Sequence, residues 1–249
     1  MGKKEKLIIS NWKDYIQTEI QAREILDGIN DYLESLSETI DIPLVFCPKN
    51  DLLISVSELL KKSHLAHNAF LGSQDIPDIK VDGLRYAILG HSSRRYNLGE
   101  TDDVVNKKIN KAIEIGLVPI VCIGEKNKDD NTDEFIENQI KATFKDLSID
   151  QIEKCMIVYE PVWAITSDLG SNPDDSNSAS DRINFINNLL AKNWNLKSES
   201  LPVGLYGGSV NSKNVNAFLS NEAFSGVLIG KASSIKTEFL KILSEIVKS

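Results

Sequence analysis

Residues 156–161 read Met-Ile-Val-Tyr-Glu-Pro, an unbroken apolar run that ends in Glu160 and Pro161. A β-strand that is buried on both faces has this continuous pattern, whereas a strand with one solvent-exposed face alternates apolar and polar residues. Comparable runs recur along the chain and predict a parallel sheet. The expected strands are residues 7–10, 42–47, 65–68, 86–90, 118–123, 156–160, 203–206 and 227–230.

Helical patterns separate these strands, for example at residues 19–36, 102–115, 132–147 and 181–194. Eight strands that alternate with helices in 249 residues predict an α/β protein, a single (β/α)8 barrel. The alternative is a doubly wound open sheet, which carries a glycine-rich nucleotide turn after its first strand. Residues 10–14 read Ser-Asn-Trp-Lys-Asp instead. No linker or low-complexity stretch divides the chain, so we expect one domain over residues 1–249.

The chain is acidic, with a net charge of −8 at pH 7 and a sequence pI of about 5.0. This balance argues against nucleic acid and anionic membranes as partners. Cys47, Cys122 and Cys155 fit no metal or disulfide spacing and predict reduced thiols. The start of the chain does not have the pattern of a signal peptide, and no apolar run approaches the roughly 20 residues that span a bilayer. We therefore expect a cytoplasmic protein.

Polar residues follow five of the expected strands, at the end where barrel proteins carry their function. Any one of them is ordinary, since a lone lysine is usually solvated and a lone histidine is usually buried or capping. Five groups at five strand ends predict a site. The set comprises Asn11, Lys13, His91, Glu160 and the glycine-containing turns at residues 207–209 and 230–231.

The chemistry of this set centres on Glu160. A carboxylate at the end of an apolar strand and beside Trp163 is partly desolvated, and burial raises the pKa of such a group toward that suited to a general base. His91 opens the helical stretch 92–96, whose positive end opposes protonation, so a neutral imidazole can donate a hydrogen bond to a carbonyl oxygen. Lys13 adds a fixed positive charge for an enediolate and for a phosphate.

The two glycine turns predict a phosphate site. Gly207-Gly208-Ser209 and Gly230-Lys231 present backbone N–H groups ahead of helices, a common way to hold a phosphate. No metal-ligand cluster and no dinucleotide fingerprint occurs in the sequence, so we expect neither a metal nor a cofactor. Together the residues predict proton abstraction next to a carbonyl on a small phosphorylated substrate.

Five segments resemble the triosephosphate isomerase family in their order and spacing, and the resemblance runs over nearly the whole chain. It implies a (β/α)8 barrel and the interconversion of dihydroxyacetone phosphate and D-glyceraldehyde 3-phosphate in glycolysis and gluconeogenesis, without a cofactor. The segments are Asn11-Trp12-Lys13, Ile88-Leu89-Gly90-His91-Ser92, Cys122-Ile123-Gly124-Glu125, Tyr159-Glu160-Pro161-Val162-Trp163-Ala164-Ile165 and Tyr206-Gly207-Gly208-Ser209-Val210.

The same resemblance implies a role for each site residue. Glu160 is the base that moves the proton between two substrate carbons, and Lys13 stabilises the negative charge. His91 and Asn11 polarise the carbonyl oxygens. The implied phosphate contacts are Thr166, Gly208, Ser209, Gly230 and Lys231. A lid that excludes water is implied to hinge at Pro161, Val162 and Trp163.

The implied lid and the eighth turn depart from the family pattern. After Ile165 the family has a Gly-Thr-Gly-like hinge, but this chain reads Thr166-Ser167-Asp168. Thr166 keeps the backbone N–H that is expected to contact phosphate, although the dihedral freedom of glycine is lost. Lys231 replaces the second glycine of the eighth turn, and its ammonium is expected either to add to phosphate binding or to remain solvated.

Three further departures concern the homodimer that the family usually forms. Ser93 stands where the family usually has a glutamate that pairs with the lysine, and Asp14 occupies a usually apolar position covered by a neighbouring subunit. The third loop, residues 69–83, is shorter than usual and lacks the Thr-Gly-Glu tip that enters the partner. A buried interface does not tolerate an unpaired Asp14. We therefore expect a monomer.

Two other functions remain open on the sequence. The altered lid, Ser93 and the shortened third loop fit a catalytically weak or inactive relative that only binds phosphorylated ligands or a protein partner. The stretch after Asp168 fits a phosphosugar enzyme with another substrate on the same barrel. The isomerase prediction is preferred because all four residues that carry the chemistry are present together.

Overall fold

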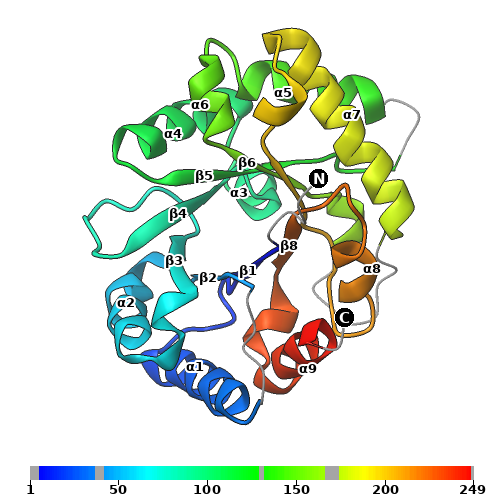
Figure 1. The fold of residues 1–249 in the computed structure, drawn as a ribbon. Helices are drawn as coiled ribbons and strands as arrows, with labels where there is room; N and C mark the ends of the chain where they lie inside the picture. Colours follow the sequence, from blue (N-terminus) through cyan, green and yellow to red (C-terminus); the bar gives the residue numbers. More distant parts are fainter. Residues whose placement is uncertain (1–5, 37–41, 129–131, 166–173, 248–249) are drawn as a thin grey trace.

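The protein folds into a closed barrel of parallel strands, described by a computed structural model over residues 6–36, 42–128, 132–165 and 174–247 (Figure 1). Strands that follow one another in the sequence pair with each other, and β1 closes the ring by pairing with β8. A closed ring confirms the predicted (β/α)8 barrel and excludes the open sheet. The strands are β1 (Leu7–Asn11), β2 (Leu44–Cys47), β3 (Ala69–Ser73), β4 (Leu84–Leu89), β5 (Val118–Ile123), β6 (Met156–Tyr159), β7 (Val203–Tyr206) and β8 (Gly226–Ile229).

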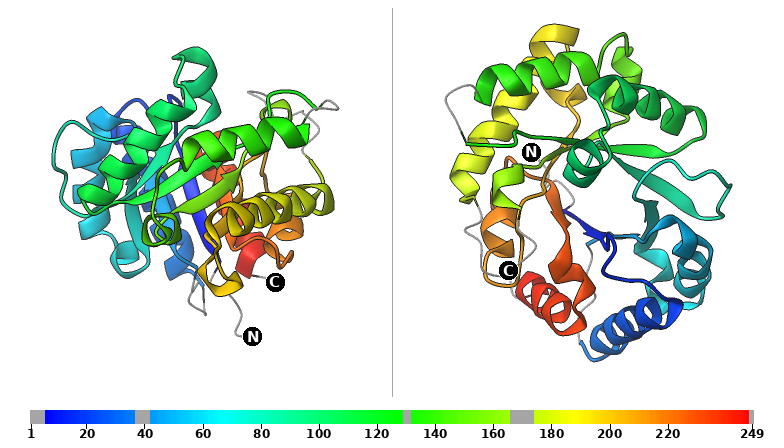
Figure 2. Two further views of the ribbon diagram at one scale, coloured as in Figure 1. Left: turned by 90° about the horizontal axis from the view of Figure 1, so that it is seen from above. Right: turned by 180° about the vertical axis from the view of Figure 1, so that it is seen from behind.

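Helices form an outer ring that covers the strands (Figures 1 and 2). The chain passes from β3 to β4 through residues 74–83 without a helix. The α-helices are α1 (Glu19–Glu34), α2 (Leu53–Lys62), α3 (Ser92–Asn97), α4 (Asp102–Glu114), α5 (Thr132–Thr143), α6 (Ile149–Glu153), α7 (Ser176–Trp194), α8 (Val215–Leu219) and α9 (Lys236–Val247). The 3₁₀ turns are η1 (Asn50–Leu52), η2 (His64–His67), η3 (Val162–Ala164), η4 (Ser198–Ser200) and η5 (Lys231–Ser234).

Side chains on the strands alternate between two apolar layers. On β5, Ile120 and Cys122 point into the barrel, while Val121 and Ile123 pack outward against the helices. Successive side chains on a strand point to opposite faces, so a strand buried on both faces is apolar at every position. The interior is filled by these side chains, and only the strand ends remain open for a site. The other buried interior residues are Leu7, Ile9, Val45, Cys47, Ile88, Val158, Leu205 and Leu228.

A side-chain cap sets the start of α7. Asp175 accepts the backbone N–H groups of Asn177 and Ser178, which have no partner inside the helix. The helix therefore begins at Ser176, before the apolar periodicity that predicted a start at residue 181. The other three predicted helices, α1, α4 and α5, begin at the expected residues and end up to four residues earlier than expected.

The third strand differs from the sequence prediction. The expected strand at residues 65–68 is the turn η2, from which Leu65 is buried in the core. The strand is β3, which occupies the start of the segment expected to be a loop. Position 72 inside this strand leaves room only for glycine, because an added Cβ would come 2.5 Å from Cys47 Sγ. The third loop is therefore residues 74–83 rather than 69–83.

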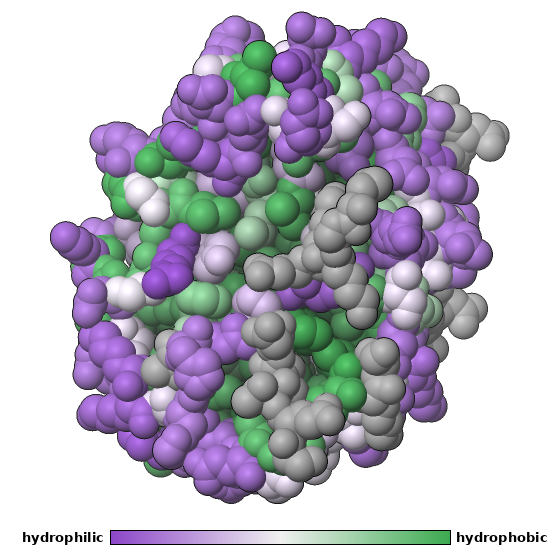
Figure 3. All heavy atoms as spheres, viewed as in Figure 1, coloured by the Kyte–Doolittle hydropathy of each residue, from purple (hydrophilic) through white to green (hydrophobic). Residues whose placement is uncertain are grey.

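The face seen in Figure 1 is mainly hydrophilic at its edges, and hydrophobic side chains are visible in the hollow at its centre (Figure 3). Some large apolar side chains are exposed on separate elements, such as Ile20 on α1 and Ile54 on α2. Single exposed apolar residues are ordinary on protein surfaces. Every helix in the described part of the chain is too short or too polar to span a bilayer.

Candidate active site

Glu160 lies where β6 ends and the chain leaves the barrel. Its N–H donates to the carbonyl of Ile123 at 2.8 Å, so its backbone is still held by the sheet. Gly124, directly after the neighbouring strand β5, approaches so closely that a Cβ there would lie 2.0 Å from the Glu160 carbonyl oxygen. Only glycine allows this approach. The backbone of Glu160 is therefore fixed by a rigid element.

The Glu160 carboxylate is buried, with 3% of the residue exposed, and it rests on the start of α3. Oε2 accepts the Ser92 N–H at 2.8 Å, and Oε1 accepts the Ser92 hydroxyl at 3.3 Å. His91 Nε2 lies 2.9 Å from Oε1, which is ion-pair distance but without the alignment of a hydrogen bond. Charge-assisted bonds of this kind hold an ionised carboxylate firmly.

This environment corrects the pKa that the sequence predicted. Burial raises the pKa of the Glu160 carboxyl, but the His91 ring, the Lys13 ammonium and the Ser92 N–H lower it, and the net pKa lies below the ordinary value. Desolvation disfavours the charged form, whereas donors and positive charge favour it. The expectation of a raised pKa was wrong because the sequence showed the apolar strand but not the groups that the fold brings to its end.

His91 is the N-cap of α3 and follows Gly90, whose φ of 67° turns the chain from strand to helix. A residue with a side chain would be strained in that conformation. His91 Nδ1 accepts the Ser93 N–H at 3.2 Å and lies 2.8 Å from Ser93 Oγ. An accepting Nδ1 carries no proton, so in this arrangement the ring proton is on Nε2. Nε2 is the atom that faces Glu160.

Lys13 adopts the left-handed backbone conformation, with a φ of 46°. This conformation is uncommon for lysine and costs free energy. Asn11 Oδ1 accepts the Lys13 N–H at 3.2 Å, and Gln74 Nε2 donates to the Lys13 carbonyl at 3.2 Å. Gln74 Nε2 also donates to the Cys47 carbonyl at 3.0 Å. Both peptide groups that flank Lys13 are thus held in place by side chains.

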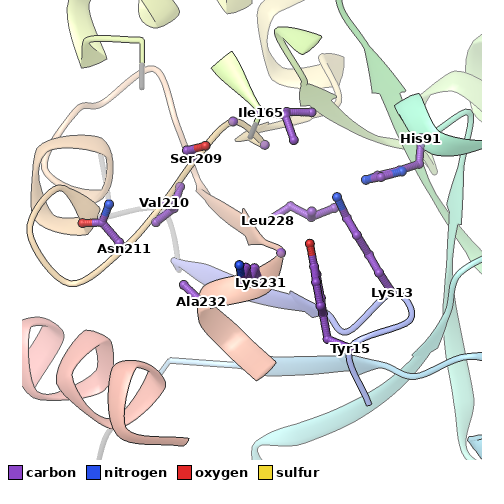
Figure 4. A pocket seen from close by; sticks show the side chains of 13 residues that line it. Lys13, Tyr15, His91, Ile165, Ser209, Val210, Asn211, Leu228, Lys231 and Ala232 are labelled. Atoms are coloured by element: carbon purple, nitrogen blue, oxygen red, sulfur yellow. The ribbon is translucent and has the colours of Figure 1, made fainter. Parts of the chain in front are cut away.

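A pocket at the strand ends brings together residues that follow β1, β4, β7 and β8 (Figure 4). Lys13 Nζ lies beside Gly230, where an added Cβ would be 3.7 Å from the nitrogen. Two lysines and no carboxylate are among the described residues that line the pocket, so it is suited to an anion. The predicted site residues that line it are Lys13, His91, Gly208, Ser209, Gly230 and Lys231.

The phosphate turns are not the helix N-termini that the sequence predicted. After Ser209 the chain continues through residues 210–214 before α8, and Lys231 begins the 3₁₀ turn η5 rather than an α-helix. Ser209 donates its N–H at 3.2 Å and its hydroxyl at 2.7 Å to the carbonyl of Ala164. A helix dipole therefore contributes little here, and the positive potential comes from turn N–H groups and lysines. An anion that binds Ser209 competes with the Ala164 carbonyl.

The predicted hinge residues form the turn η3, which Pro161 precedes. Trp163 Nε1 donates to Glu125 Oε1 at 2.8 Å, and the Tyr159 hydroxyl donates to the same oxygen at 2.9 Å. Glu125 is buried, so both donors offset the cost of removing its charge from water. The bond from Trp163 to Glu125 thus holds the turn η3 against the segment that follows β5. 

A second pocket adjoins the first and shares Lys13 and His91 with it. Asn11, Asp14 and Ser93 line this second pocket rather than the first. Asn11 is nevertheless bonded to the Lys13 backbone, so the structure groups it with the other candidate residues. The four residues predicted to carry the chemistry therefore lie at one end of the barrel.

Two parts of the predicted site stand apart from the phosphate pocket. Glu160 lines neither pocket, because Ser92 holds its carboxylate. Thr166 and the rest of the predicted lid over residues 166–170 lie outside the described residues. The Glu160 carboxylate therefore faces Ser92 rather than either pocket.

Sequence reasoning missed four residues of the site. Ser92 holds the Glu160 carboxylate, Glu125 holds the predicted hinge, and Gln74 supports the Lys13 backbone. Tyr15 lines the pocket. Ser92 and Glu125 belong to segments that carry the family resemblance, so a signal was present for them. Gln74 had none, because it follows the strand that the sequence misplaced.

No three His, Cys, Asp or Glu side chains among the described residues are grouped to hold a metal ion. The cysteines are free and buried. Burial raises the pKa of the Cys47 and Cys122 thiols and raises the pKa of Cys155 to about 12. Buried protonated thiols are poor nucleophiles and act in packing.

A closed (β/α)8 barrel with a carboxylate, a histidine and a lysine at its strand ends, beside an anion pocket, defines the class of barrel proteins with an active site at the carboxyl ends of the strands. The model of the family described as triosephosphate isomerase matches residues 6–246. The chain belongs to the triosephosphate isomerase family.

Known relatives resemble the chain over almost its whole length. The triosephosphate isomerase of Aquifex aeolicus is 34% identical over 251 residues, which cover 96% of this chain and 98% of that protein. The triosephosphate isomerase of Dictyoglomus thermophilum is 32% identical over 256 residues, which cover 96% of this chain and 99% of that protein. The triosephosphate isomerase of Clostridium botulinum is 34% identical over 251 residues, which cover 96% of this chain and 98% of that protein.

Proposed function

We propose that this chain is a triosephosphate isomerase, which interconverts dihydroxyacetone phosphate and D-glyceraldehyde 3-phosphate in glycolysis and gluconeogenesis. Membership of the family over residues 6–246 supports this activity. The observation that carries it for this chain is that Glu160, His91 and Lys13 converge beside an anion pocket. We further propose that residues 1–249 form one domain that contains the whole site.

Glu160 is the base in this proposal. Its carboxylate leaves Ser92, takes a proton from C1 of dihydroxyacetone phosphate and returns it to C2. The intermediate is an enediolate, whose negative charge Lys13 stabilises, while His91 Nε2 and the Asn11 amide donate hydrogen bonds to the two oxygens. One proton moves from carbon to carbon and one from oxygen to oxygen, so the product has the same atoms as the substrate.

The phosphate is proposed to bind the turns after β7 and β8. Both turns line a common pocket, and the Lys231 ammonium adds charge to it. The Ser209 donors are released from the Ala164 carbonyl when the anion binds. The full proposed set is Gly208, Ser209, Gly230, Lys231 and Thr166 for the phosphate, with Pro161, Val162 and Trp163 as the hinge of a lid.

A coupled assay with D-glyceraldehyde 3-phosphate tests the activity. Glu160→Asp withdraws the carboxylate by one methylene, and a base misplaced by roughly 1 Å costs about 100-fold in kcat. Glu153→Asp on the exposed surface of α6 is the control and should match the wild type. Background turnover by the wild type, with glycerol 3-phosphate still bound in calorimetry, would support a protein that only binds phosphate esters.

We propose that the protein is a monomer and that it is cytoplasmic. The short connection at residues 74–83, an exposed Asp14 and a Ser93 that faces His91 support the absence of the usual dimer. Three free buried cysteines fit a reducing compartment. The net charge of −8 favours a small substrate over nucleic acid or membrane as partner. A sedimentation mass of twice the 27.7 kDa chain at micromolar concentration would overturn the monomer.

A further inference from the structure

Tyr15 lines the phosphate pocket, and none of the roles above uses it. It lies two residues after Lys13, in the loop that follows β1, and 36% of the residue is exposed. Tyrosine combines an apolar ring with a polar tip, and it is common where one end of a side chain packs and the other meets a ligand or water. The position at the mouth of a pocket therefore raises the question of what its hydroxyl binds.

A rigid turn presents Tyr15 beside Lys13. Trp12 is fully buried and packs against Phe46, with the ring centroids 5.7 Å apart. The Tyr15 N–H donates to the Trp12 carbonyl at 2.9 Å and closes the turn. Gln74 holds the Lys13 carbonyl inside the same turn. The backbone that carries Tyr15 is thus placed before a ligand arrives, which reduces the entropy lost on binding.

The Tyr15 side chain lies next to that of Lys13, and the hydroxyl and the ammonium point in the same direction (Figure 4). Lys231 lies in the same pocket, and the described lining residues include no carboxylate. A phenol is both a donor and an acceptor, and beside ammonium groups it donates most favourably to an anion. An anion that the positive charge of Lys13 attracts into this pocket is therefore also an acceptor for the hydroxyl.

We propose that Tyr15 is a further substrate-binding residue, whose hydroxyl donates a hydrogen bond to a phosphate oxygen of the bound ester. The proposal rests on the proposed function for the identity of that ester, a triose phosphate, but the chemistry holds for any small phosphate monoester. Tyr15 reaches the phosphate from the loop after β1, whereas the backbone N–H donors come from the turns after β7 and β8. The phosphate is then bound from two directions.

Tyr15→Phe tests the proposal, because it removes the hydroxyl and keeps the ring. Tyr32→Phe on α1 is the matched control. Calorimetry with glycerol 3-phosphate, a monoester that cannot isomerise, measures binding without turnover. A hydrogen bond to a charged group in a pocket open to solvent predicts a Kd about 5–10-fold higher for Tyr15→Phe. KM for D-glyceraldehyde 3-phosphate should rise by the same factor, with kcat unchanged.

D-Glyceraldehyde, which lacks the phosphate, separates a phosphate contact from other roles. The kcat/KM for D-glyceraldehyde should be the same for Tyr15→Phe and the wild type. A Kd for glycerol 3-phosphate within about 2-fold of the wild type would overturn the proposal. An equal loss with D-glyceraldehyde would also overturn it, since Tyr15 would then act on the reacting carbons or on the fold.

Failure of the proposed function would look different. A wild type that binds glycerol 3-phosphate more tightly than Tyr15→Phe, yet turns over no triose phosphate, would keep the role of Tyr15 and remove the isomerase assignment. A wild type with normal turnover and a Tyr15→Phe variant with unchanged Kd would keep the isomerase assignment and remove the role of Tyr15.

Discussion

Gly124→Ala tests whether the close approach of two strand ends positions the base. The added methyl would lie 2.0 Å from the Glu160 carbonyl oxygen and 2.5 Å from its carbonyl carbon. Real Cβ atoms do not come closer than 3.0 Å to other heavy atoms, so the segments that follow β5 and β6 must separate by 3.0 − 2.0 = 1.0 Å. Both crowded atoms belong to the backbone, and no rotation of a side chain can relieve the contact.

A displacement of this size should lower kcat/KM for D-glyceraldehyde 3-phosphate by about 100-fold, which is the cost of misplacing a reacting group by roughly 1 Å. Overpacking should also lower the free energy of unfolding by about 1–3 kcal/mol, and Tm by about 2–12 °C. The affinity for glycerol 3-phosphate should hardly change, because the phosphate turns follow β7 and β8. Retained affinity also shows that the variant has folded.

Gly28→Ala on α1 is the control, since its added Cβ meets only the flexible side chain of Lys236, at 2.5 Å. It should keep wild-type kinetics. Steady-state kinetics, calorimetry and a thermal melt measured on both variants give the comparison. A folded Gly124→Ala protein with kcat/KM within about 3-fold of the wild type would refute the reasoning, because the base would not depend on the approach of Gly124.

Other contacts of the site carry expectations of their own. Burial raises the pKa of Glu160, but the His91 ring, the Lys13 ammonium and the Ser92 N–H lower it below the ordinary 4.5. The ionised carboxylate therefore stabilises the fold above about pH 4.5, and this stabilisation is lost as the pH falls through the lowered pKa. Tm should fall in that range, and Glu160→Gln should flatten the fall; equal slopes would contradict this. Trp163→Phe leaves Glu125 Oε1 with one of its two donors, and urea unfolding should show a loss of about 1–3 kcal/mol; no loss would mean that the bond is not made in solution. Lys231→Gly should raise the Kd of glycerol 3-phosphate by about 3–10-fold, whereas an unchanged Kd would assign the ammonium to solvent.

The barrel could be predicted from the order of apolar runs, because strands buried on both faces leave a continuous signal that is local to each strand. β5 and β7 fall at the expected residues, Val118–Ile123 and Val203–Tyr206. β3 does not, since the strand is Ala69–Ser73 rather than residues 65–68, and it contains Gly72, where Cys47 leaves no room for a side chain. That contact exists only once two strands lie side by side, so the residue pattern of the third strand could not show it.

At the site, the sequence by itself determined which groups are present and at which strand ends they lie. Only the tertiary structure decided the environment of each group. Burial raises the pKa of Glu160, but His91, Lys13 and Ser92, which follow other strands, lower it further. The Ser209 donors are engaged because the fold brings Ala164 to them. The periodicity of buried residues depends on neighbours in the sequence, so it can be read from each segment alone. The electrostatic field at an atom depends on groups a few ångströms away in space, and these are distant in the sequence.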